Sequence, residues 1–81
     1  MDTYKTKVVF RAYKDNDIIA LFPYEDAGNG WISSYMHVGQ HSAADYNMVI
    51  RCTKPAMPIE YEPLRVELES IGYNLTICKR K

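Results

Sequence analysis

The side chains best suited to metal binding or nucleophilic chemistry are two histidines and two cysteines: His37, His41, Cys52 and Cys78. His37 and His41 fall at the end of an expected strand, four residues apart, so they share no rigid helical face. A zinc site needs three or four ligands in a closed geometry, and neither cysteine follows the histidines at metal-ligand spacing. We therefore predict no metal and no cofactor, while a site formed by His37, His41 and Cys52 stays open.

Other sequence patterns give no stronger indication of catalysis. Gly28-Asn29-Gly30 has the composition of a turn and lacks the lysine and the strand-to-helix context of a phosphate-binding loop. The glutamates between residues 60 and 69 are expected on the solvated side of a helix. A nucleophile would need a neighbouring base and an oxyanion pocket, and a chain of 81 residues has little room for a deep cleft. The sequence predicts a protein that is not an enzyme.

The first half of the chain reads as strands. Residues 6–13 alternate between two faces, and residues 18–22 form a continuous apolar run, so the two segments predict a hairpin joined by the polar turn 14–17. Pro23 should end the second strand, because proline cannot donate to a strand ladder. Residues 31–38 predict a third strand, with Ile32, Met36 and Val38 on the core face beside Val8 and Phe10 of the first strand.

The second half combines two helices with a last strand. Ser42 is a candidate N-cap for a helix over residues 43–52, although a strand over 47–53 is the competing interpretation. After the stiff connector 54–58, apolar spacing predicts a helix that ends at Ile71, because Gly72 adopts the left-handed cap angles freely. Pro63 leaves the start of this helix open: it begins near Glu60, or it kinks at the proline. Residues 74–79 predict the final strand.

These elements predict one α+β domain over residues 1–81, in the order β-β-β-α-α-β. We expect a small antiparallel sheet with both helices packed on one face, because each helix has one apolar stripe to bury. The last strand is expected beside the first. Two cysteines are too few for the disulfide framework of a small secreted domain, and the first residues lack the apolar run of a signal peptide. The cytoplasm is therefore the expected location.

An aromatic surface is the most unusual feature that this arrangement predicts. Tyr13, Trp31 and Tyr35 should lie on the sheet face that points away from the helices. Such a face is typical of a homodimer interface, or it stacks the bases of single-stranded nucleic acid. It is also compatible with ordinary half-exposed surface, since much of a folded surface is apolar.

The charges are distributed unevenly although the net charge is zero. Both ends of the chain are basic and the middle is acidic. If the last strand lies beside the first, one basic patch should gather the cations of both ends: Lys5, Lys7, Arg11, Lys79, Arg80 and Lys81. This patch would suit nucleic acid, whereas the simpler interpretation is solvated charge that keeps a small domain in solution.

Several distinctive segments are spread along almost the whole chain: Val8–Arg11, Ile19–Pro23, His37–His41, Thr53–Ala56, and Glu60-Tyr61 with Leu64 and Glu67-Leu68. Together they resemble a group of small bacterial proteins without an established activity. The Gly39-Gln40-His41 and Thr53-Lys54-Pro55-Ala56 elements are the most specific of these. The resemblance implies a soluble bacterial protein and transfers no functional residue. Pro63 departs from the pattern of the group.

The sequence as a whole predicts a small non-catalytic interaction module that associates with itself or with an unknown protein partner. The alternative is a weak nucleic-acid-binding protein that uses the basic termini and the aromatic face. A membrane partner is not expected, because no stretch approaches the roughly 18 apolar residues of a membrane span.

Overall fold

A computed structural model describes residues 5–28, 30–36 and 40–79 of the chain. In this part, the first four strands are β1 (Thr6–Ala12), β2 (Ile18–Gly28), β3 (Trp31–Met36) and β4 (Gln40–Ala44). They are followed by α1 (Tyr46–Cys52), β5 (Lys54–Pro55), α2 (Pro58–Ser70) and β6 (Leu75–Cys78). None of the described helices is long and apolar enough to span a membrane.

The strands form one mixed sheet. β4, β3, β2 and β1 follow one another in antiparallel order, which confirms the predicted hairpin of β1 and β2. The outer edge of β1 is shared by two short strands: β6 runs parallel to its first half, and β5 runs antiparallel to its last residues. The final strand therefore lies beside the first, as expected, but the prediction of an all-antiparallel sheet was wrong.

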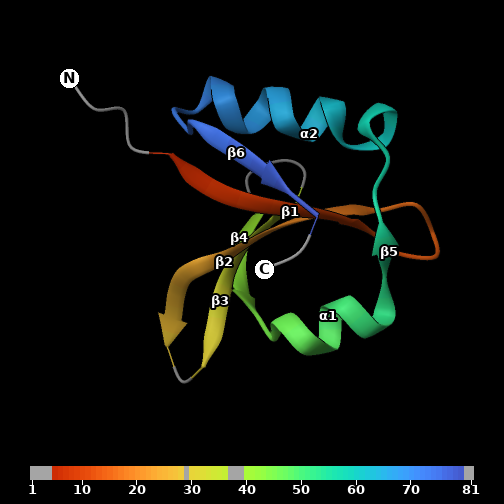
Figure 1. Ribbon diagram of the computed structural model, residues 1–81, viewed down its shortest axis with the longest axis vertical. Coiled ribbons are helices and arrows are strands. Elements are labelled where there is room, and N and C mark those ends of the chain that lie inside the picture. Colours follow the sequence, from red (N-terminus) through yellow and green to blue (C-terminus); the bar gives the residue numbers. More distant parts are fainter. Residues whose placement is uncertain (1–4, 29, 37–39, 80–81) are drawn as a thin grey trace.

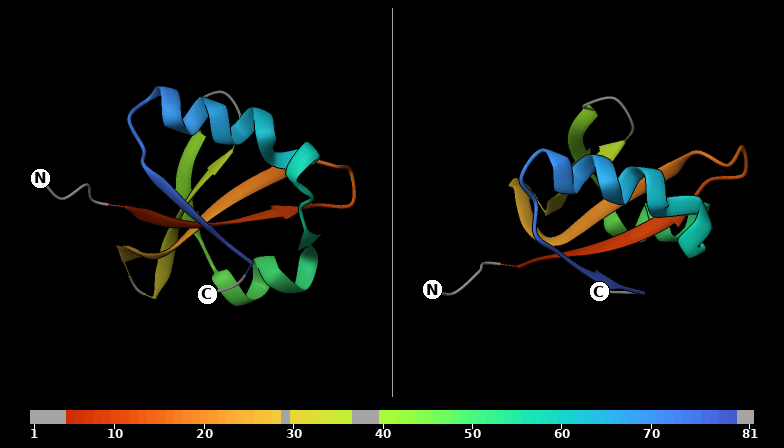
Figure 2. Two further views of the ribbon diagram at one scale, coloured as in Figure 1. Left: turned by 45° about the horizontal axis from the view of Figure 1, so that its top comes forward. Right: turned by 90° about the horizontal axis from the view of Figure 1, so that it is seen from above.

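The two helices lie on opposite faces of the sheet, so the prediction that both pack on one face was wrong (Figures 1 and 2). Leu64 and Leu68 of α2 pack on a cluster with Val8, Phe10, Ala20, Phe22 and Tyr35. Val49 of α1 packs on the other cluster, with Val9, Ile19, Leu21, Ile32 and Ala44. Both faces of β1 and β2 carry apolar side chains, and each face needs a cover to remove that surface from water.

The prediction that Pro23 ends the second strand was also wrong, because β2 continues to Gly28. The pairing of β2 with β3 is irregular here: Phe22 pairs with Ser33, and the next pair is Asp26 with Ile32. Pro23 lies within this bulged stretch. A bulge leaves residues unpaired, so the missing N–H of proline costs the ladder little.

The segment before α1 is a strand rather than the start of a helix. β4 pairs with β3, and the hydroxyl of Ser42 lies 3.1 Å from that of Ser34 instead of capping a helix. Asp45 is the N-cap, and its Oδ1 accepts a hydrogen bond from the backbone N–H of Met48 at 3.3 Å. Helix is confirmed over the competing strand for residues 46–52, while the predicted start at residue 43 was wrong. The predicted β-strand residues 37 and 38 lie outside the described part.

Helix α2 begins at Pro58 and includes Pro63 in its interior. It ends as predicted: Gly72 has a φ of 113°, and the N–H of Tyr73 donates to the carbonyl of Leu68 at 3.1 Å. Tyr73 then folds back so that its ring stacks on Phe22, with 5.2 Å between the ring centroids. At the other end of α2, the ring of Tyr61 stacks on Phe10 at 4.4 Å. These two stacks fix α2 along its cluster.

Candidate interaction surfaces

The aromatic face predicted from Tyr13, Trp31 and Tyr35 is not formed. Tyr35 pairs with Ala20 and is only 2% exposed, and its hydroxyl donates to Oε2 of Glu67 on α2. Tyr13 is partly buried against the other cluster, under α1, whereas Trp31 is 46% exposed at the far end of β3. The register of β3 places Ile32 and Tyr35 on opposite faces, and both faces are covered.

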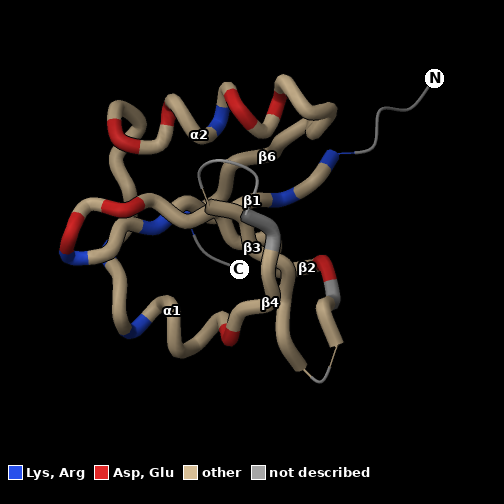
Figure 3. The backbone as a smooth tube through the Cα atoms, turned by 180° about the vertical axis from the view of Figure 1, so that it is seen from behind, with Lys and Arg blue, Asp and Glu red and all other residues tan. Residues whose placement is uncertain are grey.

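The basic patch predicted from the two termini is divided by the parallel pairing of β1 and β6. Lys5 and Lys7 are exposed at the start of β1. Cys78 pairs with Val9, so Lys79 follows beside the later half of β1, whereas Lys5 precedes the strand. In Figure 3 the basic positions, in blue, are spread over several elements. The ammonium of Lys7 lies over the ring of Tyr24, 5.1 Å from its centroid. Arg80 and Lys81 lie outside the described residues.

Arg11 is not a surface cation but the buried end cap of α1. Its side chain is 8% exposed and makes three hydrogen bonds. Nε donates to Oγ1 of Thr53 at 2.9 Å, and Nη2 donates to the carbonyls of Thr53 at 2.6 Å and Ile50 at 3.1 Å. These carbonyls belong to the end of α1, where the helix leaves acceptors without intrahelical donors. Arg11 satisfies them and places its positive charge at the negative end of the helix.

The outer edge of β6 offers unpaired backbone groups. The carbonyl of Asn74 accepts from the N–H of Thr6 at 2.8 Å and therefore points toward β1. Backbone groups alternate sides along a strand, so the N–H and C=O groups of Leu75 and Ile77 point away from β1. Within the residues that the structure describes, no other strand pairs with β6 on that side. The side chain of Ile77 is 41% exposed.

A pocket of about 310 Å³ lies beside this edge, where β6 and β5 leave a gap along β1. We call it the edge pocket; its walls include Phe10, Pro55, Pro58, Tyr61, Ile77 and Lys79. The stacked rings of Phe10 and Tyr61 are part of its lining.

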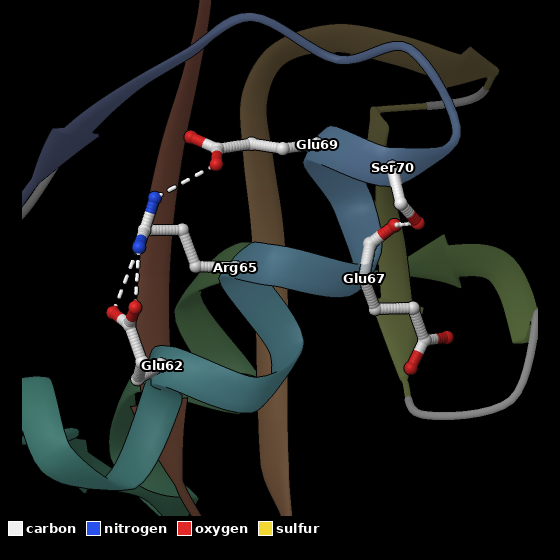
Figure 4. A network of polar contacts seen from close by, with 5 residues as sticks. All are labelled: Glu62, Arg65, Glu67, Glu69 and Ser70. Carbon is white, nitrogen blue, oxygen red and sulfur yellow. Dashed lines mark hydrogen bonds and ion pairs between the residues drawn. The ribbon is translucent and has the colours of Figure 1, made fainter.

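The polar side chains of α2 form an exposed network rather than a catalytic pair (Figure 4). Arg65 donates to Glu62 through Nε at 2.9 Å and to Glu69 through Nη1 at 2.8 Å. The hydrogen bonds from Arg65 hold the pKa of the Glu62 carboxyl below its usual value. All three side chains are in contact with solvent, so the network adds little to the stability of the fold.

The cysteines are free thiols, with Cys52 exposed at the end of α1 and Cys78 half-buried in β6. His37 lies outside the described residues, so the site considered from His37, His41 and Cys52 stays a hypothesis. The described residues contain no group of three metal-ligating side chains. Comparisons with protein families, with curated proteins and with solved structures found no match to this chain.

The sequence predicted a final strand, but not that its outer side would be an unpaired edge of the sheet. Two features of the sequence are nevertheless typical of such an edge. A four-residue strand that follows a helix and ends at Cys78, just before Lys79, is short enough to be an edge strand. The connector with Pro55 and Pro58 cannot complete the edge, since proline provides no N–H for a ladder. The sequence patterns did not predict that β6 pairs in parallel with β1, and this pairing leaves the gap between β6 and β5 in which the edge pocket lies.

Proposed function

We propose that this chain is a non-catalytic interaction module that self-associates through the outer edge of β6. The observation that carries the proposal is the pair of outward backbone amides at Leu75 and Ile77 beside the edge pocket. A strand added to a sheet edge gains main-chain hydrogen bonds, and a neighbouring pocket receives its side chains. We take the cytoplasm as the place of action, which suits the two free thiols.

A second copy of this chain fits the edge better than an unrelated strand. A two-fold axis pairs a strand with its own copy in antiparallel orientation, so that one surface serves both partners. The predicted contact through a sheet face has no support, because α1 and α2 cover the faces. The opposite edge, β4, carries the small exposed side chains of Ser42 and Ala43. β6, by contrast, carries the exposed side chain of Ile77, which lines the edge pocket.

The pairing of two four-residue strands gives a small interface, which predicts a weak dimer. The apparent mass in solution should therefore rise with protein concentration toward that of two chains. Interfaces of this size depend on the few residues at their centre. Ile77 is such a residue, since its side chain is exposed and its backbone groups point outward.

Replacing Ile77 with proline should abolish self-association and leave the fold intact. The N–H of residue 77 points away from β1, so proline removes a donor for the partner and none for the sheet. Light scattering behind size exclusion should give the mass of one chain for Ile77→Pro at concentrations where the parent is dimeric. Ile77→Val, which keeps the N–H, is the matched control and should behave as the parent does. A proline variant that folds and dimerises like the parent would refute the edge pairing.

The alternative function, binding of nucleic acid, remains a prediction. Lys5 and Lys7 are available to it, but they do not lie with Lys79 in one patch, and Arg11 is buried. A separate group of cations, Lys14, Arg51 and Lys54, lines a pocket at the opposite end of β1.

A further inference from the structure

We propose a binding site for a phosphate monoester of a nucleotide at the end of the sheet where β1 turns into β2. A pocket of about 390 Å³ lies here, lined by Tyr13, Lys14, Arg51, Cys52, Thr53 and Lys54 among others. We call it the basic pocket. Its three lysine and arginine side chains come from three places: the β1–β2 turn, the last turn of α1, and β5. No carboxylate of the described residues is part of its lining.

Arg11 favours anion binding in the basic pocket because it neutralises the negative end of α1. The carbonyl end of a helix attracts cations and repels anions, so the end of α1 would oppose phosphate binding if it were open. The guanidinium of Arg11 already occupies the carbonyls of Ile50 and Thr53. No carboxylate among the described residues pairs with Arg11, so its charge is compensated only by these carbonyls and the Thr53 hydroxyl. The field of the surface cations is therefore not cancelled by the helix end.

The cations of the basic pocket are also free of ion pairs within the described part of the chain. The ion pairs found there join Arg65 to Glu62 and Glu69 on α2, where carboxylates are one helical turn away. Lys14, Arg51 and Lys54 make no such pair. Three unpaired cations around one hollow raise the local concentration of an anion.

The arrangement suits a phosphate monoester better than a carboxylate. A phosphate monoester offers three terminal oxygens, each of which can accept more than one hydrogen bond, whereas a carboxylate offers two. A guanidinium binds two of these oxygens as a fork, and each ammonium acts as a point charge. Tyr13 lines the same pocket, and its phenol is a potential donor because it is protonated at neutral pH.

The neighbouring hollow indicates what is attached to the phosphate. It shares Tyr13, Lys14, Arg51 and Cys52 with the basic pocket, and its lining adds Met36, Asp15 and Asp17. The two carboxylates disfavour a second phosphate on this side. The ring of Tyr13 and the thioether of Met36 favour a flat, uncharged group, as the base of a nucleoside monophosphate is. The source is a free nucleotide or the phosphorylated 5′ end of a single strand, because both present this chemistry.

Alkylation of Cys52 by iodoacetamide tests the site directly, and Cys78 is the internal control. Cys52 lines the basic pocket, whereas Cys78 lines the edge pocket. Adenosine 5′-monophosphate should slow the alkylation of Cys52 several-fold and leave that of Cys78 unchanged. Adenosine, which has no phosphate, should have no effect. Equal protection by adenosine, or no protection of Cys52 by the monophosphate at low salt, would overturn the proposal.

Two double variants of equal charge change separate the site from general electrostatics. Arg51→Gln/Lys54→Gln removes two of the three pocket cations and should raise the Kd for adenosine 5′-monophosphate by about tenfold or more. Lys5→Gln/Lys7→Gln removes two cations at the other end of β1 and should change it by less than about twofold. Equal losses in both variants would contradict a defined site. Inorganic phosphate and oligonucleotides with and without a 5′-phosphate, titrated in parallel, identify the source of the phosphate.

Discussion

Replacing Arg11 with methionine should destabilise the fold by about 2–5 kcal/mol, mainly because the partly buried carbonyls of Ile50 and Thr53 lose their donor. Methionine keeps most of the apolar stem, so the change reports on the hydrogen bonds more than on packing. Urea denaturation of the variant and the parent measures the difference in the free energy of unfolding.

Arg65→Met is the matched control for this prediction. Arg65 also makes hydrogen bonds to two residues, but its partners Glu62 and Glu69 are exposed carboxylates that water can solvate after the substitution. We expect a much smaller loss than at Arg11. Similar losses at the two positions would mean that Arg11 does not act as the buried cap of α1.

The second large effect is expected at Leu68, which is fully buried in the cluster beneath α2. Leu68→Ala should cost about 2–5 kcal/mol, because the cavity left behind adds to the lost transfer free energy. A matched pair of valine-to-alanine substitutions tests burial on the opposite face of the sheet, under α1. Val49 of α1 is 8% exposed, and Val66 on the outer side of α2 is 51% exposed.

Val49→Ala should therefore destabilise the fold by about 1–3 kcal/mol, and Val66→Ala by less than about 1 kcal/mol. The comparison uses one chemical change at two exposures. It tests whether α1 buries Val49 against the cluster on its face of the sheet. Indistinguishable effects of the two valine substitutions would contradict a core under α1.

The local elements could be predicted where one signal dominates. The hairpin followed from alternation in residues 6–13 and the apolar run 18–22, and both lie in strands. The end of α2 followed from Gly72, whose positive φ matches the expected cap. In both cases a short stretch of chain determines the conformation, and no distant contact is needed to choose between alternatives.

The arrangement of the layers could not be predicted, because both sets of alternating residues in β3 are compatible with burial. Ile32 and Met36 look like one core face, and Trp31 and Tyr35 look like an exposed aromatic face. The register with β2 instead buries Tyr35 under α2 and Ile32 toward α1. Because α2 covers the face that carries Tyr35, this face is not available as the predicted aromatic interface.

β4 was missed for a different reason. Its residues, Gln40 to Ala44, are polar or small and have little intrinsic preference for strands. They form a strand because they pair with β3, and the Ser34 hydroxyl donates to the carbonyl of Ser42 at 3.0 Å. Likewise, the role of Arg11 depends on α1 lying across β1, which no pattern within residues 6–12 reveals.

The location of the candidate sites follows from this layered arrangement. Helices cover the two faces of the sheet, so its edges and ends remain for contacts with other molecules (Figure 2). The edge pocket and the basic pocket both lie along β1, one beside β6 and the other at the turn into β2. The Ile77 variant therefore tests self-association, and the variant of Arg51 and Lys54 tests phosphate binding. Loss of either property should leave the other unchanged.

Amide hydrogen exchange in β6, followed by NMR at increasing protein concentration, tests the proposed edge pairing most directly. The amides of Leu75 and Ile77 should exchange more slowly as the apparent mass rises, because they become donors to the partner strand. The amide of Thr76 points toward β1 and should be protected at every concentration. Exchange at Leu75 and Ile77 that stays fast while the mass doubles would place the interface elsewhere and contradict pairing through β6.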